Sequence, residues 1–172
     1  MAQPDTVVMY TDGACINNPG RGGYGVVLLC AGRRKELAAG YRRTTNNRME
    51  IMAALAGLRA LKYPCNVTIY TDSRYLADAM MLGWVAKWRA KGWRRSATEP
   101  VLNSDLWQQL QELCAYHTVS FMWVKGHAGD AENERCDHLS VQAAKGADLL
   151  IDEGYERKDD PLPAPAPTLF DE

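Results

Sequence analysis

The sequence has no run of about 18 apolar residues, so we expect neither a transmembrane helix nor contact with a membrane. Its first residues, MAQPDTVVMYTDG, contain neither a basic region nor an apolar stretch, which is unlike a secretory signal. The five cysteines form no C-x-x-C pair, which argues against a zinc site or a disulfide framework. These absences indicate a cytoplasmic protein with reduced thiols. The 172 residues, of which 47% are hydrophobic, suffice for one domain with an ordinary core.

The net charge of −1 conceals an uneven distribution of charged residues along the chain. Residues 148–172 hold eight acids and two bases, a net of −6, so the rest of the chain carries a net of +5. A basic body is compatible with a nucleic-acid partner, although ordinary charge scatter would give the same numbers. Because four of the eight prolines lie between Pro161 and Pro167, we expect residues 148–172 to form an acidic, proline-rich, disordered tail.

The hydrophobic pattern predicts an α/β fold. Runs rich in β-forming residues predict strands at residues 6–11, 24–30, 36–42, 67–71 and 118–124. Helical spacing predicts helices at residues 47–62, 73–81, 103–116 and 132–145. Asp130 is the expected N-cap of the last helix. Short connections make the first three strands antiparallel, and helical crossovers make the later ones parallel. The expected architecture is one mixed five-stranded sheet flanked by helices.

Four carboxylates stand in distinctive contexts: Asp12 in TDGAC, Glu50 in TTNNRME, Asp72 in YTDS and Asp137 in GHAGDAENERCD. Asp12 and Asp72 end predicted strands that should be parallel neighbours, so both would emerge at the same sheet edge. Glu50 and Asp137 lie on helices that can reach this point. Converging carboxylates repel one another unless cations lie between them, and hard oxygen ligands suit Mg²⁺ or Mn²⁺. A single aspartate at a strand end usually caps or turns the chain, but four together predict a two-cation site for phosphoryl transfer.

Five segments carry a resemblance to a known family: TDGAC, NNPGRGGYG, TTNNRME, YTDS and VKGHAGDAENERCD. Over residues 6–145 they resemble bacterial type 1 ribonuclease H. The resemblance implies a ribonuclease H-like fold in a catalytic domain of residues 1–147. It also implies that the four carboxylates bind two Mg²⁺ ions, for which Mn²⁺ would substitute. The implied reaction is cleavage of the RNA strand of an RNA–DNA hybrid, which leaves a 5′ phosphate and a 3′ hydroxyl. We expect a monomer that removes primers and R-loops.

The resemblance also implies roles for residues around the carboxylates. His127 lies in the glycine-flanked loop GHAG, where an imidazole can shuttle a proton or help release the product, although it could be an ordinary surface histidine. Amide and backbone groups can bond the 2′-hydroxyls in the wide minor groove of a hybrid, although Asn46 and Asn47 could instead cap a helix. Thr45 and Asn103 match positions that hold a DNA phosphate. The expected substrate contacts are Gly13, Cys15, Asn18, Thr45, Asn46, Asn47, Arg74, Trp84, Trp88 and Asn103.

The segment WVAKWRAKGWRR, residues 84–95, interleaves tryptophans with lysines and arginines. Cations bind phosphates while aromatic faces pack on sugars or bases. Trp84 and Trp88 are four residues apart and so share one helix face. By resemblance this segment is a basic protrusion that grips the DNA strand, with at least one tryptophan anchored in the core. Arg74 follows TDS where relatives often carry glutamine, which favours contact with a phosphate.

Two other functions fit parts of the pattern. An integrase-like nuclease with the same fold would act on DNA, but the asparagines and the protrusion argue against it. A hybrid-binding module without catalysis would be expected to have lost at least one carboxylate, and all four are present. Leu169 and Phe170 in PTLFDE loosely resemble peptides by which bacterial replication proteins hold the sliding clamp, although an idle tail explains them as well.

Overall fold

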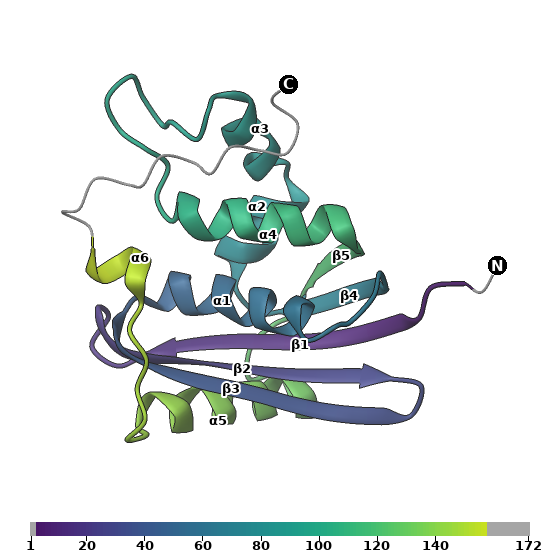
Figure 1. Cartoon of the computed structure of the whole chain (residues 1–172). Coiled ribbons are helices and arrows are strands. Elements are labelled where there is room, and N and C mark those ends of the chain that lie inside the picture. Colours follow the sequence, from purple (N-terminus) through teal and green to yellow (C-terminus); the bar gives the residue numbers. More distant parts are fainter. Residues whose placement is uncertain (1–2, 158–172) are drawn as a thin grey trace.

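The computed structural model describes residues 3–157, which contain one five-stranded sheet (Figure 1). The strands are β1 Thr6–Cys15, β2 Gly20–Cys30, β3 Arg33–Thr44, β4 Asn66–Thr71 and β5 Thr118–Trp123. Their order in the sheet is β3-β2-β1-β4-β5. β2 is antiparallel to β1 and β3, whereas β4 is parallel to β1 and β5. The predicted mixed sheet with three antiparallel strands is therefore confirmed.

Polar side chains cap the N-termini of the three helices that contain or directly follow Glu50, Asp72 and Asp137. Thr45, Ser73 and Asp130 each accept a hydrogen bond from a backbone N–H in the first turn of α1 (Asn46–Arg59), α2 (Arg74–Met81) and α5 (Ala131–Ala144), respectively, which confirms the predicted Asp130 cap. The predicted order of elements lacked α3 as a separate helix and lacked α6. The helices are α1 Asn46–Arg59, α2 Arg74–Met81, α3 Trp84–Ala90, α4 Ser104–Tyr116, α5 Ala131–Ala144 and α6 Glu153–Glu156.

The sheet separates two helical layers. α1 covers one face with α4 packed against it, and α5 covers the other face (Figure 1). Met9 and Ile69 from the sheet, Ile51 and Leu55 from α1, and Trp107 from α4 are almost completely buried in this core. Each large apolar side chain that is fully buried contributes about 1.5–3 kcal/mol, so α1 is held firmly against β1 and β2. None of the helices within residues 3–157 is long and apolar enough to cross a membrane.

Strand β2 begins earlier than the sequence pattern predicted. The predicted strand started at residue 24 and left out the preceding glycine-rich stretch NNPGRGG, but Gly22 and Gly23 already pair with β1. Gly23 and Gly25 are explained by α5, which lies against the strand, and a Cβ atom on Gly23 would lie 2.4 Å from the backbone oxygen of Ser140. A Cβ atom on Gly25 would lie 2.3 Å from the backbone oxygen of Cys136, so only glycine permits this approach. The glycines therefore seat α5 on the sheet as well as turning the chain.

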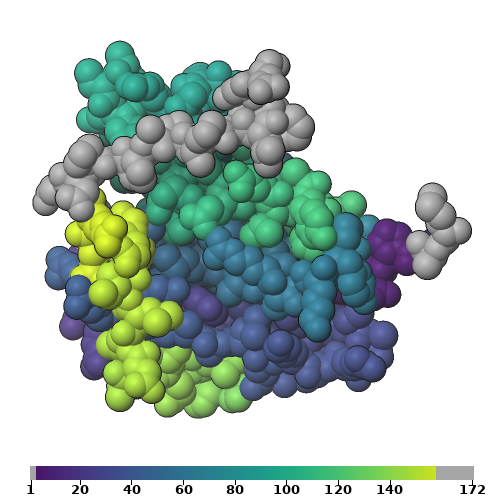
Figure 2. All heavy atoms as spheres, viewed as in Figure 1, coloured from purple at the N-terminus to yellow at the C-terminus, as the bar shows by residue number. Residues whose placement is uncertain are grey.

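The expected disorder from residue 148 onward is wrong for residues 148–157. Leu150 exchanges backbone hydrogen bonds with Gly40 and Arg42 at the outer edge of β3, and a short helix, α6, follows. Figure 2 shows this segment, in yellow-green and yellow, lying along the end of the sheet toward α1 and α4. The physical reason is a buried ion pair between Asp152 and Arg48. Residues 158–172, with Leu169 and Phe170, lie outside the described residues.

Candidate active site

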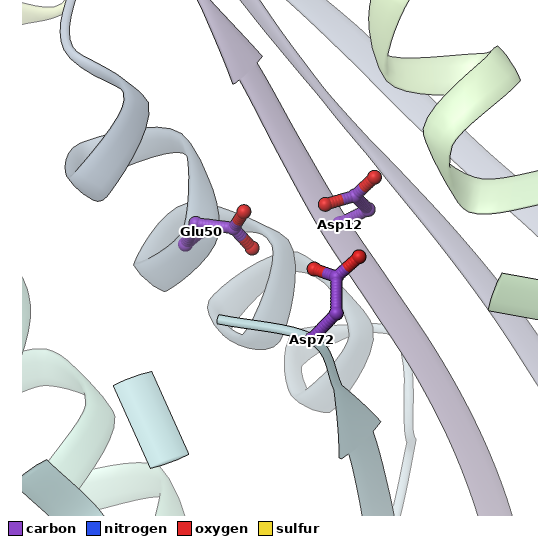
Figure 3. A group of neighbouring side chains, drawn as sticks. All are labelled: Asp12, Glu50 and Asp72. Atoms are coloured by element: carbon purple, nitrogen blue, oxygen red, sulfur yellow. The ribbon is translucent and has the colours of Figure 1, made fainter. Parts of the chain in front are cut away.

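Three of the four predicted carboxylates converge at the edge where β1 and β4 part. The two strands are paired in parallel as far as Thr11 and Thr71, so the next residues, Asp12 and Asp72, lie side by side. β1 continues past Asp12 to Cys15, so the prediction that Asp12 ends its strand was wrong, although its parallel pairing does end there. Glu50 approaches from α1, and the three side chains point toward one another (Figure 3). One carboxylate oxygen from each lies within 4.8 Å of the other two.

Close contact between α1 and β1 brings Glu50 to this point. A Cβ atom on Gly13 would lie 2.5 Å from the backbone nitrogen of Glu50 and 2.6 Å from the carbonyl carbon of Met49. Only glycine tolerates such an approach, so Gly13 sets the distance between the helix and the strand. The backbone N–H of Gly13 also donates to Asp12 Oδ1 at 2.9 Å, which helps to fix the direction of that carboxylate.

The electrostatics of the three carboxylates are unfavourable without a counter-charge. Burial raises the pKa of Asp12 to about 8, and the charges of Asp72 and Asp137 add to the rise. Burial also raises the pKa of Glu50 well above its ordinary value, with further contributions from Asp12 and Asp72. Glu50 is 4% exposed, and its Oε2 atom has no hydrogen-bond partner within residues 3–157. Buried acids of this kind call for cations that would stabilise their ionised forms.

The geometry of the carboxylates fits a small, hard divalent cation. Two oxygens on opposite sides of Mg²⁺ at about 2.1 Å lie at most about 4.2 Å apart. The observed limit of 4.8 Å therefore needs only a slight contraction around an ion. The free Oε2 atom of Glu50 supplies a ligand that nothing else in the described chain uses. An all-oxygen set favours Mg²⁺ or Mn²⁺ over softer metals.

Asp137 lies beside this trio but is not a member of it. It is half-buried on α5, across the sheet from α1, and its charge contributes to the raised pKa of Asp12. The neighbouring Cys136 is fully buried, and its thiol donates to the backbone oxygen of Tyr10 on β1 at 3.2 Å. α5 is thereby held against β1, with Asp137 on the side of Asp12.

The loop that carries His127 passes directly over Asp72. A Cβ atom on Gly126 would lie 2.8 Å from Asp72 Oδ2, so the loop backbone touches the carboxylate. His127 itself is exposed, with a left-handed backbone at φ 55°. The structure thus brings His127 to the rim of the acidic cluster. His117 is buried, and its Nδ1 atom accepts from the backbone N–H of Cys65 at 3.1 Å, so it has a structural role.

The polar residues expected to meet the substrate cluster at the start of α1. Thr45, not Asn46 or Asn47, caps the helix, because its hydroxyl accepts from Arg48 N at 3.2 Å. The Asn18 side chain accepts from the backbone N–H of Asn46 at 3.1 Å, which joins the β1–β2 connection to the helix. Asn47 is exposed.

Cys15 lies on the same side of the sheet, at the end of β1. Its half-buried thiol donates to the backbone oxygen of Thr44 at 3.4 Å, at the point where β3 leads into α1. It therefore lies next to the start of α1, close to the polar group described above.

The basic segment forms α3 and the loop after it, beyond the end of α2 (Figure 1). The rings of Trp84 and Trp88 lie 6.4 Å apart, as expected for one helix face. Trp88 also packs on the buried Trp107 with ring centroids 5.8 Å apart, so it is the expected core anchor, whereas Trp84 is exposed. The Arg74 guanidinium lies over the ring of Trp123, 3.6 Å from its centroid, which holds this charged group in place on an otherwise exposed side chain.

Sequence reasoning missed the residues that hold Asn103. Arg48, which is 3% exposed, donates to Asn103 and forms ion pairs with Asp105 and Asp152. Burial would lower the pKa of Arg48, but hydrogen bonds to the two carboxylates outweigh burial and raise it. The available signal was spacing, because Arg48 precedes Ile51 by three residues and so lies on the buried face of α1.

Comparison with known proteins connects this arrangement to one family. The RNase H family model matches residues 4–145. A ribonuclease H of Syntrophus aciditrophicus is 60% identical over 149 residues, which are 87% of this chain and 86% of that protein. A ribonuclease HI of Synechocystis sp. is 57% identical over 153 residues, which are 88% and 96% of the two chains. The crystal structure of LC9-RNase H1, a type 1 RNase H with the type 2 active-site motif, matches with a TM-score of 0.77 at 34% identity and covers 94% of this chain and 84% of that chain.

Proposed function

The chain belongs to the ribonuclease H family, and from that premise we propose that it hydrolyses the RNA strand of RNA–DNA hybrids by two-metal-ion catalysis. The observation that carries the proposal is the convergence of Asp12, Glu50 and Asp72 within 4.8 Å at the β1/β4 edge. Asp12 and Glu50 are buried and have raised pKa values, and a bound divalent cation would relieve the cost of ionising them.

Asp12, Glu50, Asp72 and Asp137 are the proposed ligands of two Mg²⁺ ions, and Mn²⁺ would substitute. When bound, such ions supply an activated water and stabilise the leaving oxygen of an in-line displacement. Hydrolysis breaks the bond between phosphorus and the 3′ oxygen, which leaves a 5′ phosphate and a 3′ hydroxyl. His127 is proposed to shuttle a proton or to help the product phosphate leave, because its loop touches Asp72 while its imidazole faces solvent.

Selection of the RNA strand is assigned to the polar groups around the start of α1. A 2′-hydroxyl both donates and accepts, so amide side chains and backbone groups suit it. Asn18 and Asn46 are joined by a hydrogen bond, and neither Asn46 nor Asn47 is used to cap the helix, which leaves their amides available. The proposed contacts to the RNA minor groove are Gly13, Cys15, Asn18, Asn46 and Asn47.

Contacts to the DNA strand are assigned to Thr45 at the start of α1, to Asn103 directly before α4, and to the basic segment of residues 84–95. Thr45 and Asn103 are proposed to hold one DNA phosphate. Trp84, with Trp88 behind it, would pack against sugars, while the lysines and arginines of residues 84–95 bind phosphates. Arg74 is proposed to bind a phosphate because it keeps its charge while stacked on Trp123.

The proposal is tested with labelled RNA–DNA, RNA–RNA and DNA–DNA duplexes, each with Mg²⁺ and with chelator. The matched control is Asp12→Asn, which keeps the size of the side chain and removes its charge. Metal-dependent cutting of RNA in the hybrid alone, lost in the control, is the expected result. Cutting of DNA–DNA would favour the integrase-like alternative, and binding without cutting would favour the hybrid-binding module.

In the cell we propose that the protein works in the cytoplasm as a monomer that removes primers and R-loops. Its catalytic domain would extend through residue 157, because residues 148–157 pack on β3 and α1. The proposed sliding-clamp contact of Leu169 and Phe170 is tested by a pull-down with the tail peptide and a doubly substituted control peptide. Equal recovery of the clamp with both peptides would end that proposal.

A further inference from the structure

The guanidinium of Arg48 connects the C-terminal segment to the proposed DNA contacts. Its Nε and Nη2 atoms donate hydrogen bonds to the Asp152 carboxylate at 2.7 and 2.9 Å, respectively. Its Nη1 and Nη2 atoms donate to the Asp105 carboxylate at 2.9 and 2.7 Å, respectively. Nη1 also donates to Asn103 Oδ1 at 3.3 Å. A guanidinium has five N–H donors, so each of them has an acceptor here. Arg48 is therefore fixed in position and in orientation.

Arg48 touches both residues that are proposed to hold a DNA phosphate. Its backbone N–H donates to the Thr45 hydroxyl at 3.2 Å, and its side chain donates to Asn103 Oδ1. This second bond decides which way the amide points, so the Asn103 nitrogen faces away from Arg48 and donates to Tyr75 OH at 3.0 Å. Trp107 Nε1 donates to the same hydroxyl at 3.3 Å. An amide nitrogen has two hydrogens, so one remains for a phosphate oxygen.

Asp152 in turn fixes Arg48. It is 1% exposed, accepts from the Thr44 hydroxyl at 2.6 Å, and also caps α6. The segment that carries it is fastened to β3 through the backbone hydrogen bonds of Leu150. Without Asp152, Arg48 would lose two of its five hydrogen bonds and one of two charge partners. Asp105 would still balance the charge of Arg48, but the guanidinium would be held from one side only and could turn away from Asn103.

We infer that Asp152, acting through Arg48, is a positioning residue for the DNA strand of the hybrid. It lies beyond residues 4–145, which the family model matches, and more than 100 residues along the chain from Arg48. The inference rests on the proposed function, since it takes Thr45 and Asn103 to bind a DNA phosphate. Asp152 is proposed to contact neither the substrate nor the acidic cluster. Its proposed effect is to hold Thr45 and Asn103, through Arg48, in the positions that bind the DNA phosphate.

The test compares Asp152→Asn with Asp148→Asn in steady-state cleavage of a hybrid, well below the unfolding temperature of both variants. Each variant removes one negative charge from the C-terminal segment, but Asp148 is exposed and outside the hydrogen-bond network. Weakening one hydrogen bond to a charged phosphate should raise KM roughly tenfold in Asp152→Asn, with kcat changed less than about twofold. Asp148→Asn should keep wild-type constants.

A second substrate separates positioning from general loss of structure. In this hybrid, the DNA strand carries neutral methylphosphonate linkages in place of phosphates, so a phosphate contact can no longer contribute. The KM difference between Asp152→Asn and wild type should shrink to less than about twofold on this substrate. An equal difference on both substrates would overturn the inference, and so would an unchanged KM in a variant with a lowered unfolding temperature.

If Asp152→Asn does not fold, Thr44→Val provides the same comparison with a smaller perturbation. Valine has nearly the shape of threonine and removes only the hydroxyl that donates to Asp152. It should raise KM about two- to threefold on the phosphate hybrid and not on the methylphosphonate one. No change on either would refute the inference. Wild-type protein that fails to cut any hybrid would instead refute the proposed function, so the two failures are distinguishable.

Discussion

The acidic cluster predicts that the metal-free protein loses stability as the pH rises, and that Asp12→Asn removes much of this loss. The pKa of Asp12 is raised by burial and by neighbouring carboxylates, so the folded state binds its proton more tightly than the unfolded chain does. A group with a raised pKa stabilises the fold fully below its ordinary pKa, and this contribution disappears as the pH passes its folded value. The stability of the metal-free protein should therefore fall over the pH range from 3.8, the ordinary pKa of the group, to about 8, the pKa of Asp12 in the folded protein.

The size of the effect follows from the width of that window. Each unit of pKa difference corresponds to about 1.36 kcal/mol, so about three units between the ordinary value and neutral pH give at most about 4 kcal/mol at pH 7. Asparagine has no proton to lose and nearly the same shape, and its side-chain oxygen can still accept from the Gly13 N–H. Asp12→Asn should therefore be more stable than wild type in chelator, by an amount that grows with pH.

Urea unfolding in chelator at about pH 5, 7 and 8.5 measures this directly as a difference in the free energy of unfolding. Addition of Mg²⁺ should reverse the order, because a cation that binds only the folded state stabilises wild type more than the variant. A free-energy difference between Asp12→Asn and wild type that is constant across pH would refute the argument. Wild-type stability that increases with pH in chelator would contradict it even more directly.

Three further predictions concern the chemistry and the grip on the substrate. Asp137→Asn should lower kcat by at least about 10²-fold on a hybrid, because it removes a charge beside Asp12, and a change below about threefold would exclude it as a metal ligand. Trp84→Ala should raise KM without changing the unfolding temperature, whereas Trp88→Ala should cost about 3 kcal/mol in urea unfolding because Trp88 packs on Trp107. Lys87→Gln should reduce the slope of log Kd against log salt by about one, measured by fluorescence anisotropy with inactive protein, and an unchanged slope would remove Lys87 from the phosphate contacts.

Local signals explain why much of the fold could be predicted from the sequence. Asp130 was identified as a cap because an acceptor side chain directly precedes a helical pattern, and the structure has that cap. The antiparallel and parallel pairings followed from the lengths of the connections. The glycines before Tyr24 were left out of the predicted strand because glycine occurs in turns and in closely packed strands alike, and for Gly23 only the position of α5 distinguishes the two roles.

The acidic cluster was predictable for the same reason. Asp12 and Asp72 each follow a run of strand residues, and Glu50 falls early in a helical pattern, so the general geometry of parallel strands brings them together. Neither the raised pKa values nor the contact between Gly13 and Glu50 could be obtained from the sequence, because both depend on the distance between α1 and β1. The identity of the clustered carboxylates could be predicted from the sequence, whereas their pKa values required the packing of α1 on β1.

Asp152 shows where such reasoning fails and why. Its partner Arg48 lies 104 residues earlier in the chain, and residues 148–172 offer eight acids as candidates. Composition made that whole segment look disordered, because prolines and acids outnumber apolar residues near its end. Yet an arginine on the buried face of α1 must have an acidic partner, since an unpaired buried charge would cost several kcal/mol. Asp105 can serve as that partner, so only the structure shows that part of the acidic segment folds back and that Asp152 also pairs with Arg48.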